Sequence, residues 1–426
     1  MAFLYDLIFL FIAAVYLPIY ALKRKFHKGF AQRFGNVEVD LKGRPIWIHA
    51  VSVGEMKSCE QLIAGLRRLY PHTPLAISTV TATGNKIARS IAKEGDLVFY
   101  LPLDFSFIVR RLVNRLNPAL FIITETEIWP NLISFLYQRN TPIVTVNARI
   151  SDKSFKGYRL IRGLISPVLR KIKFFCVQSE ADSRRLSLLG VDQDKIRITG
   201  NMKYDYTDYG KGDYSRCRAK LALGAKERLF VAASTHPGEE EAVLKVYKEL
   251  LGKFSDLNLL IAPRHPERSM QVAESIKSSG FEPVLISGLD ADNANNASTQ
   301  DARRIFILDT IGQLIPFYAI SDIVFIGGSL VKKGGHNILE PAFFGKPVLT
   351  GPYMFNFKDI INTFAKAKAV ITVGNPGELR DKIAFLLNNK EEAAFLGQRS
   401  KKIFAQNQGA SRSNLECVGA IFKEDI

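Results

Sequence analysis

Short, unbroken runs of apolar and β-branched residues alternate with amphipathic stretches along most of this chain. A strand that is apolar at every position is buried on both faces, which is typical of a parallel sheet covered by helices on each side. The alternation of such strands with helices therefore predicts a doubly wound α/β fold. The predicted strands span residues 46–51, 75–78, 97–101, 120–124, 143–146, 174–177 and 196–198, and then 229–232, 259–262, 284–286, 305–308, 323–326, 348–349 and 370–373.

The alternating pattern runs through the chain twice, which predicts two domains. A length of 426 residues suits two domains, and the pattern is interrupted at residues 204–214, which are rich in Asp, Gly and Tyr. We expect one Rossmann-like domain over residues 26–208 and a second over residues 209–426, with a last helical stretch, 391–422, that returns to the first domain. In open α/β sheets ligands bind beyond the carboxyl ends of the strands, so side chains that follow strands are the candidates for a site.

Residues 3–22 form an almost unbroken apolar run, interrupted by Asp6 and Pro18. About twenty apolar residues match the thickness of a bilayer core, so the run predicts a transmembrane anchor over residues 1–25. By the positive-inside rule, the basic residues after the run place the body of the protein in the cytoplasm. A cleaved signal peptide fits worse, because these charges follow the run, and a helix lying in one leaflet stays as an alternative. The basic residues are Lys23, Arg24, Lys25 and Lys28.

The net charge of +17 predicts an anionic partner, which is phospholipid, nucleic acid or a phosphorylated substrate. The chain has neither zinc-finger spacing nor an RNA-binding aromatic motif, so we expect no nucleic acid. Residues 149–173 hold eight basic residues and one acid, Asp152, with apolar residues between them. This composition predicts either an amphipathic contact with an anionic membrane surface or a solvated helix face. The four cysteines lack metal-ligand spacing and are expected to be reduced thiols of a protein that faces the cytosol.

Two glycine pairs follow the predicted strand at 323–326, the first at Gly327-Gly328 and the second at Gly334-Gly335. We expect the second pair to open a helix whose first turns contain Glu340. Glycine lets backbone N–H groups approach an anion, and a helix N-terminus adds a partial positive charge, so the segment predicts a nucleotide-sugar site. Glu340 would accept hydrogen bonds from sugar or ribose hydroxyls. A tight turn with a helix cap is the structural alternative.

Charged side chains also follow strands of the first predicted domain. Glu55 lies at a strand-to-helix turn, where a carboxylate is either a helix cap or a general base for a sugar hydroxyl. Glu125 and Glu127 point to one side if their strand continues through them. One is a candidate cap and the other a candidate ligand of a substrate hydroxyl, with structural roles for both as the alternative. Lys203 follows residues 196–198 and either reaches a phosphate or is solvated.

Segments after strands of the second predicted domain offer further polar groups. Arg264 follows one strand, and an arginine fork binds phosphate oxygens, although a surface arginine in a proline-rich turn has the same position. Residues 234–239 offer hydroxyls and backbone donors at a helix start. Residues 309–313 follow another strand and are expected to line the base or the ribose of a nucleotide.

Five motifs occur in order: Ser-Val-Gly-Glu (52–55), Thr-Glu-Thr-Glu-Ile-Trp-Pro (124–130), Gly-Asn-Met-Lys (200–203), Pro-Arg-His (263–265) and Gly-Gly-His-Asn-Ile-Leu-Glu-Pro (334–341). With the apolar N-terminal run, they make the whole chain resemble the 3-deoxy-D-manno-octulosonic acid (Kdo) transferases of Gram-negative bacteria. The resemblance implies a GT-B fold, in which two Rossmann-like doubly wound domains face a cleft. It also implies an N-terminal transmembrane helix in the bacterial inner membrane, with the catalytic domains on the cytoplasmic side.

The reaction implied by the resemblance moves Kdo from CMP-Kdo, bound by the second domain, to the lipid A precursor, bound by the first. This acceptor is a tetra-acyl disaccharide 1,4'-bisphosphate of lipopolysaccharide biosynthesis, and the anomeric configuration inverts. Glu55 corresponds to the family's proton acceptor, and Glu125 and Lys203 correspond to residues that stabilise the transition state. No cofactor and no metal is implied, and Gln313 stands where the family often has a glutamate. The residues at CMP-binding positions are Pro263, Arg264, Ile311, Gly312, Gln313, Asn337, Ile338, Leu339 and Glu340.

Two other functions fit the same pattern. A non-hydrolysing sugar-nucleotide epimerase shares the two-domain form and the glycine-rich donor site but needs no membrane anchor. A membrane-tethered protein that binds a nucleotide sugar without catalysis needs no general base. Replacement of Glu55 by alanine separates these functions, because the transferase hypothesis predicts loss of transfer while donor binding is kept.

Overall fold

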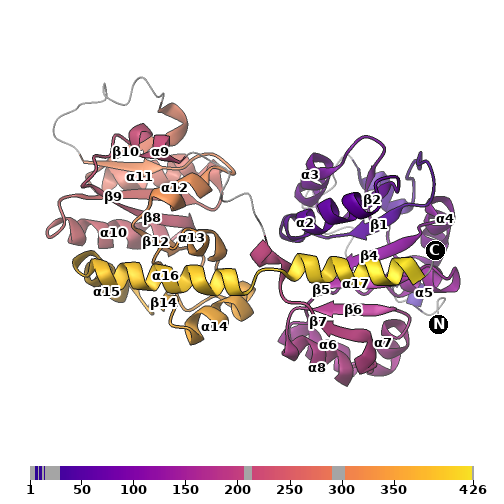
Figure 1. Cartoon of the computed structure of the whole chain (residues 1–426). Helices are drawn as coiled ribbons and strands as arrows, with labels where there is room; N and C mark the ends of the chain where they lie inside the picture. The colour runs from indigo at the N-terminus through magenta and orange to yellow at the C-terminus, as the bar shows by residue number, and fades with distance from the viewer. Residues whose placement is uncertain are drawn as a thin grey trace. The chain divides into compact units, whose positions relative to one another are not determined.

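The chain forms two compact units, each built around its own parallel β-sheet (Figure 1). Unit 1 comprises Met1–Tyr206 and Asn407–Ile426, and unit 2 comprises Thr207–Gln406. The structure is a computed structural model that describes residues 5–7, 9–11, 14, 29–205, 214–289 and 303–424. The predicted domain boundary at residue 208 lies outside the described residues.

The sheet of unit 1 has seven parallel strands in the order β3-β2-β1-β4-β5-β6-β7. The chain adds β2 and β3 on one side of β1 and then returns to add β4 on the other side, and ligands bind at such a switch point. The strands are β1 (Ile46–His49), β2 (Leu75–Thr79), β3 (Leu97–Tyr100), β4 (Leu120–Thr124), β5 (Ile143–Ala148), β6 (Phe174–Val177) and β7 (Ile196–Ile198). The helices are η1 (Phe30–Phe34), α2 (Val53–Leu69), α3 (Ala82–Ile91), α4 (Ser106–Leu116), α5 (Pro130–Gln138), α6 (Asp152–Leu160), α7 (Arg162–Leu169), α8 (Glu180–Leu188), η2 (Gln193–Lys195), η3 (Met202–Asp205) and α17 (Ala410–Glu424).

The central strands of unit 1 are buried on both faces, as their unbroken apolar sequences predict. All four side chains of β1 are buried. Trp47 belongs to one buried cluster with Phe99 and Phe121, whereas Ile46 and Ile48 belong to a second cluster that includes residues of α2. Successive strand residues point to opposite faces, so an apolar side chain at every position requires a covering layer on each side.

The sheet of unit 2 also has seven parallel strands, in the order β10-β11-β9-β8-β12-β13-β14. Its first strand, β8, lies between β9 and β12, which makes a second switch point. The two parallel sheets confirm the predicted pair of Rossmann-like domains. The strands are β8 (Arg228–Thr235), β9 (Leu257–Pro263), β10 (Glu282–Leu285), β11 (Arg304–Ile307), β12 (Ile323–Ile326), β13 (Val348–Thr350) and β14 (Ile371–Thr372). The helices are α9 (Ser215–Lys220), α10 (Glu239–Leu251), η5 (Pro266–Arg268), α11 (Ser269–Ser278), η6 (Ile286–Gly288), α12 (Leu314–Ile320), α13 (Leu339–Phe343), η7 (Phe355–Phe357), α14 (Lys358–Lys366), α15 (Pro376–Asn388) and α16 (Lys390–Gln406).

The helical stretch predicted at residues 391–422 forms two helices, α16 in unit 2 and α17 in unit 1. Gly409 lies between them with φ of 102°, a backbone conformation that favours glycine. Helix α17 packs on α2 (Figure 1). Asn414 of α17 accepts the N–H of Asn147 (3.1 Å) and donates to Thr199 Oγ1 (2.9 Å). The end of the chain is therefore part of the fold of unit 1.

The predicted transmembrane helix, residues 3–22, lies mostly outside the described residues. Across the part of the chain that the structure describes, no helix is both long and apolar enough to cross a membrane. Asp6, the acid within the apolar run, is described. Its carboxylate accepts hydrogen bonds from Ser106 N–H (3.0 Å) and Asn131 Nδ2 (2.8 Å), so this acid has polar partners in unit 1.

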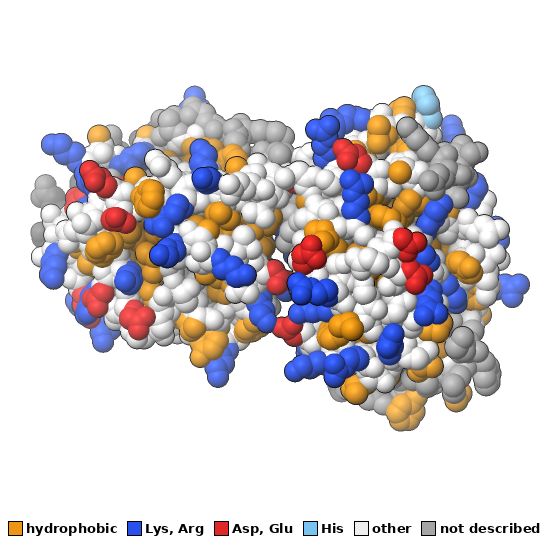
Figure 2. All heavy atoms as spheres, turned by 60° about the horizontal axis from the view of Figure 1, so that its bottom comes forward, with side chains coloured by type: hydrophobic (Ala, Val, Ile, Leu, Met, Phe, Trp, Pro, Cys, Tyr) orange, Lys and Arg blue, Asp and Glu red, His pale blue; other side chains and the backbone are white. Residues whose placement is uncertain are grey.

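Basic side chains are prominent on the surface, as the net charge of +17 requires. On the face shown in Figure 2, lysine and arginine side chains stand among exposed apolar ones, with fewer acidic side chains between them. The exposed large apolar side chains of unit 1 include Leu160 and Leu164. A surface of this kind favours anionic partners.

Candidate active site

Glu55 lies where β1 leads into α2, and it makes the contacts of a helix cap. Its carboxylate accepts hydrogen bonds from Val51 N–H (2.8 Å) and Ser52 Oγ (2.9 Å), and Ser52 Oγ accepts in turn from Glu55 N–H (3.4 Å). This reciprocal arrangement resembles a capping box. The side chain is half-buried, so the carboxylate is fixed as a cap and still reaches the surface.

Glu125 directly follows β4 and has φ of 59°. Strand β4 ends at Thr124, as predicted, and the left-handed backbone of Glu125 turns the chain, so the condition under which Glu125 and Glu127 would point to one side of a continuing strand is not met. Such a conformation costs on the order of 1–3 kcal/mol for a residue other than glycine and clusters at functional sites. Two contacts hold it in place: Glu125 N–H donates to Val146 O (2.9 Å), and Glu125 Oε1 pairs with Lys203 Nζ (3.0 Å).

Glu55, Glu125 and Glu127 lie within electrostatic range of one another, and Lys203 acts on Glu55 and pairs with Glu125. We call these four residues the carboxylate cluster. Burial, followed by the charge of Glu125, raises the pKa of Glu55 to about 7, while its hydrogen bonds and Lys203 oppose this shift. Burial, followed by the charges of Glu55 and Glu125, raises the pKa of Glu127 to about 7. A carboxyl group with a pKa near neutrality can exchange a proton at physiological pH, which a general base requires.

Lys203 is positioned by the short helix η3. The first residue of η3 donates its N–H to Asn147 Oδ1 (3.0 Å), and the carboxylate of its last residue accepts the N–H of Gly409 (2.6 Å). The turn that carries the lysine is therefore fixed to β5 and to the start of α17. The ion pair with Glu125 distinguishes Lys203 from a freely solvated lysine.

The loop that begins at Gly328 binds an anion, but the anion is part of the protein. The buried carboxylate of Glu239 accepts the N–H groups of Gly328 (2.6 Å), Ser329 (3.0 Å), Leu330 (2.9 Å) and His236 (3.0 Å). The prediction that these amides face a ligand is therefore wrong for the first pair. The internal carboxylate instead ties the loop after β12 to the first turn of α10.

The second glycine pair does not open a helix, which corrects another prediction. Helix α13 begins at Leu339 and has only five residues. Gly335 N–H donates to Gly328 O (2.8 Å), and a Cβ on Gly335 would lie 2.0 Å from Met354 Sδ. The second pair therefore permits close approach within the protein. Asn337 Oδ1 accepts the N–H of Leu339, the first residue of this short helix (3.0 Å).

The residues predicted to bind CMP lie at the carboxyl ends of three strands of one sheet. Pro263 ends β9 and Arg264 follows it, residues 311–313 follow β11, and residues 337–340 follow β12. In the order β11-β9-β8-β12, β11 and β9 are neighbours and β12 is separated from β9 only by β8, so the three segments share the same carboxyl edge. Arg264 is exposed there. The side chains of Ile338 and Leu339 are fully buried, so only their backbone atoms can contact a ligand.

A histidine pair at this edge was missed by the sequence analysis. His236 follows β8 and His336 follows β12, and their Nε2 atoms lie 2.9 Å apart with the rings stacked. Burial, followed by the charges of Arg264, His236 and His265, lowers the pKa of His336 to about 4. Burial also lowers the pKa of His236, with smaller contributions from His265 and Lys333. Both rings are therefore neutral at pH 7, and the pair lies next to the predicted phosphate ligand Arg264.

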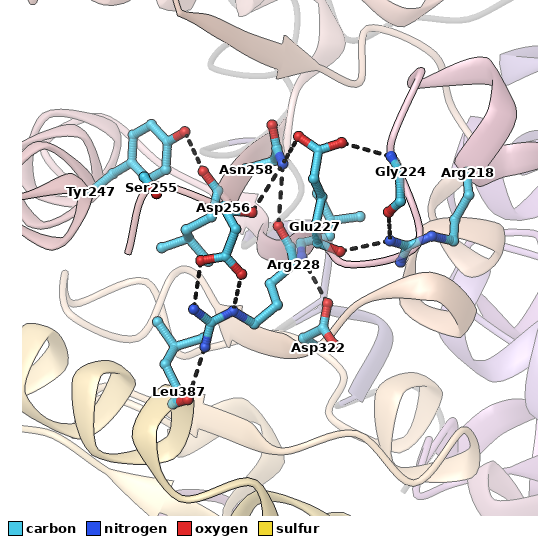
Figure 3. Close-up of polar contacts among 12 residues, drawn as sticks. Arg218, Gly224, Glu227, Arg228, Tyr247, Ser255, Asp256, Asn258, Asp322 and Leu387 are labelled. Atoms are coloured by element: carbon cyan, nitrogen blue, oxygen red, sulfur yellow. Dashed lines mark hydrogen bonds and ion pairs between the residues drawn. The ribbon is translucent and has the colours of Figure 1, made fainter. Parts of the chain in front are cut away.

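A cavity of about 740 Å³ lies at the opposite, amino edge of the same sheet. The arginines that line it are bound to protein partners (Figure 3). Arg228 pairs with Asp256 (2.6 Å) and donates to Leu387 O (2.8 Å), and Arg218 donates to Glu227 O (2.6 Å). These two arginines stabilise the fold of unit 2. Because they are already engaged by protein groups, the carboxyl edge is the better candidate for the donor site.

Two parallel-sheet Rossmann-like units, each with charged side chains at the carboxyl edge beside its switch point, define a GT-B-like glycosyltransferase fold. Within ranges 29–205, 214–289 and 303–424, no group of three or more His, Cys, Asp or Glu side chains is arranged to hold a metal ion. Residues 28–206 match the family described as 3-Deoxy-D-manno-octulosonic-acid transferase (kdotransferase), and residues 296–403 match Glycosyl transferases group 1.

Two related transferases align with nearly the whole chain. The 3-deoxy-D-manno-octulosonic acid transferase of Haemophilus influenzae is 37% identical over 385 residues, which span 89% of this chain and 88% of the relative. The enzyme of the same name from Chlamydophila psittaci is 32% identical over 401 residues, which span 92% of this chain and 90% of the relative. The chain therefore belongs to the Kdo transferase family and is a glycosyltransferase, which confirms the resemblance seen in its motifs.

The likeness to epimerases is one of fold. The structure of UDP-GlcNAc 2-epimerase from Neisseria meningitidis, bound to UDP-GlcNAc, aligns with a TM-score of 0.59 at 12% identity, covering 89% of this chain and 100% of that one. The epimerase therefore resembles this chain in fold alone, whereas the transferase is also similar to it in sequence.

Proposed function

We propose that the chain transfers Kdo from CMP-Kdo to the lipid A precursor, a tetra-acyl disaccharide 1,4'-bisphosphate, with inversion at the anomeric carbon. The observation that carries this proposal is the half-buried carboxylate of Glu55, with a pKa of about 7, beside the ion pair of Glu125 and Lys203. A base with this pKa is substantially ionised at neutral pH and still basic enough to accept a proton from a hydroxyl group. The name of the relatives supports Kdo as the transferred sugar.

In the proposed step, Glu55 accepts the proton of an acceptor hydroxyl while that oxygen forms a bond to the anomeric carbon of Kdo. The bond from the anomeric carbon to the phosphate oxygen of CMP breaks, and its electron pair leaves with CMP. Glu125 holds the ammonium group of Lys203 in place at 3.0 Å. The two charges stabilise the opposite charges that develop in the transition state.

The donor residues proposed in unit 2 are those predicted from the motifs. The amides of residues 328–330 already bind Glu239, so recognition of the donor phosphate falls to side chains. Arg264 supplies a planar fork of donors next to the histidine pair. Asn337 and Glu340, which follow β12, supply polar groups for the sugar or ribose hydroxyls. Gln313, exposed after β11, supplies an uncharged amide for hydrogen bonds.

We further propose that the enzyme acts at the cytoplasmic face of the bacterial inner membrane, anchored through residues 1–25. The support is the apolar run at residues 3–22 and the basic residues that follow it. A tetra-acylated acceptor is itself a membrane lipid. An enzyme held at the bilayer is therefore confined to the same surface as its substrate.

The test compares two helix caps of similar geometry. Glu378 of α15 accepts hydrogen bonds from Gly374 N–H (2.7 Å) and Asn375 Nδ2 (3.0 Å), much as Glu55 does in α2, but it is exposed and has no carboxylate cluster. Transfer from CMP-Kdo to the lipid precursor, followed by mass spectrometry, should fall by about 100- to 10,000-fold in Glu55→Ala. Glu378→Ala should keep the rate, and both variants should bind CMP-Kdo.

Two results would contradict the proposal. If Glu55→Ala transfers Kdo as fast as the unmodified chain, Glu55 is a cap and not the base. If the purified, unmodified chain binds CMP-Kdo but does not modify the lipid precursor, the assigned acceptor is wrong.

A further inference from the structure

Helix α6 and the start of α7 form an exposed apolar surface on unit 1. No residue of α6 is buried, and every residue from 159 to 164 is exposed. Leu160 is 88% exposed, Leu164 is 62% exposed and Ile161 is 46% exposed. A group of exposed apolar side chains of this kind is typical of a surface that contacts a membrane or another protein.

The fold of unit 1 does not depend on these three side chains. Phe155 and Tyr158 attach α6 to the protein by packing against the buried cluster of unit 1. Ile165 and Val168 attach α7 in the same way. The segment therefore has inward apolar residues that hold it in place, and outward ones that no described residue of unit 1 covers.

The exposed apolar side chains are surrounded by cations. The only acid in residues 149–173 is Asp152, and it pairs with Arg185 of α8, so its charge is compensated. In Figure 2, which brings the lower side of Figure 1 forward, the side of unit 1 that carries α6 to α8 presents mainly basic and apolar side chains. The exposed basic residues of the segment are Lys153, Lys156, Arg159, Arg162 and Arg170.

This surface lies beside the carboxylate cluster. Helix α6 follows β5 at the carboxyl edge of the sheet, the same edge at which Glu55 follows β1. Thr126 Oγ1 donates to Arg149 O (2.7 Å) and accepts from Arg149 N–H (3.1 Å). Burial, followed by the charge of Glu127, raises the pKa of Tyr158, so α6 is within electrostatic range of the cluster.

We propose that Leu160, Ile161 and Leu164, with the surrounding cations, dock unit 1 onto an anionic phospholipid bilayer. The carboxylate cluster then lies close to the headgroup layer that holds the sugar of a lipid acceptor. This inference rests on the proposed function and adds a membrane contact separate from residues 1–25. Phospholipid is the occupant that the chemistry favours, because acyl chains take the leucines while headgroup phosphates bind the cations. An apolar patch of another protein would leave the cations unmatched.

Tryptophan at position 164 tests the contact in the full chain. Met270 of α11 is the matched control site, since it is 65% exposed and lies between Glu267 and Glu274 in unit 2. Vesicles of phosphatidylcholine and phosphatidylglycerol with brominated acyl chains should quench Leu164→Trp and shift its emission to the blue, beyond the change in the unmodified chain. Met270→Trp should show no added change, and vesicles of phosphatidylcholine alone should have a smaller effect on Leu164→Trp.

Either of two fluorescence results overturns the proposal. The first is an absence of added quenching at position 164 in anionic vesicles. The second is blue-shifted emission of Leu164→Trp before any vesicles are added, because protein, from unit 2 or from a second copy of the chain, then covers the surface.

Kinetics separate this inference from the proposed function. The double variant Leu160→Asp/Leu164→Asp should transfer Kdo about tenfold or more slowly to an acceptor in anionic vesicles. It should keep the rate of the unmodified chain with the acceptor in detergent micelles, because the carboxylate cluster is intact. Equal rates of the two proteins in vesicles overturn the docking surface. If the unmodified chain transfers no Kdo in either medium, the proposed function fails, and the fluorescence test still decides the docking.

Discussion

The Nε2 atoms of His236 and His336 lie 2.9 Å apart, although the two residues are 100 positions apart in the sequence. Only one hydrogen fits between the two nitrogens, so one neutral ring donates and the other accepts. Protonation of either ring would place a buried cation beside Arg264, so burial and this repulsion keep the pair neutral in the free protein. A bound phosphate would compensate that charge.

We therefore expect CMP binding to be coupled to proton uptake. Burial and neighbouring cations hold the pKa of His336 at about 4 in the free protein, and an adjacent phosphate should raise it, because an anion favours the charged imidazolium. Calorimetric titration with CMP at about pH 6, in buffers of different ionisation enthalpy, measures the uptake. His336→Asn should reduce it, and His72→Asn, an exposed site in unit 1, should not. Equal uptake by all three proteins would rule out this coupling.

The pH dependence of kcat/KM should report the ionisation of Glu55. A base acts only when deprotonated, so the rate should rise with pH and reach half its maximum near the pKa of about 7. Glu125→Gln should move this midpoint to lower pH, because Glu125 is the main cause after burial that raises the pKa. The change also leaves the charge of Lys203 free to act on Glu55, which lowers the pKa in the same direction.

Burial remains in the Glu125→Gln variant, so the midpoint should stay above the ordinary value of 4.5. Initial rates of transfer across the pH range, measured for both proteins, check this prediction. A midpoint that does not move would show that the acid limb belongs to another group.

Glu239→Gln should destabilise unit 2. The carboxylate accepts four backbone N–H groups, and an amide side chain offers one uncharged oxygen, so buried donors lose their partner. We expect the free energy of unfolding, measured in urea, to fall by about 2–3 kcal/mol. Glu241→Gln is the control, because Glu241 caps Gly238 N–H (3.0 Å) from an exposed position in the same turn. A loss in the control as large as that in Glu239→Gln would contradict the special role of the buried carboxylate.

Gly327→Ala should also destabilise unit 2, because a Cβ there would lie 2.6 Å from Ser234 O and 2.7 Å from Thr235 Cα. Both atoms belong to the backbone of β8 and cannot move aside without disturbing the sheet. A loss of about 1–3 kcal/mol in the free energy of unfolding is expected. Gly157→Ala, where a Cβ meets open space on α6, should leave stability unchanged or raise it slightly. Similar stability of the two variants would show that the strands separate easily at this point.

The sheets were predictable because a strand that is buried on both faces has apolar residues at successive positions, as in β12 and in the first three residues of β1. The end of β4 at Thr124 was predicted, but the left-handed backbone of Glu125 was not, since nothing in Thr-Glu-Thr-Glu indicates a residue with positive φ. The energetic cost of this left-handed conformation is compensated by contacts with Val146 and Lys203, which lie in other elements. Such compensation cannot be predicted from the residues next to Glu125 in the sequence.

The glycine segment illustrates the same limit at longer range. Glycine pairs after a strand correctly indicate backbone amides that bind an anion, yet the anion is Glu239, 89 positions before Gly328. The histidine pair also joins the ends of β8 and β12, which become neighbours only in the folded sheet. Comparison of the residues that follow each predicted strand would have marked His236 and His336 as candidates, although not their contact.

The bond between the last residue of η3 and Gly409 has a consequence for biosynthesis. The turn that carries Lys203 is completed by residues close to the carboxyl terminus, and α17 then covers α2, the helix that begins with Glu55. A nascent chain in which residues 407–424 are still inside the ribosome lacks this support. Unit 1 should therefore complete its fold only after the whole of unit 2, which lies between its two segments in the sequence, has been synthesised.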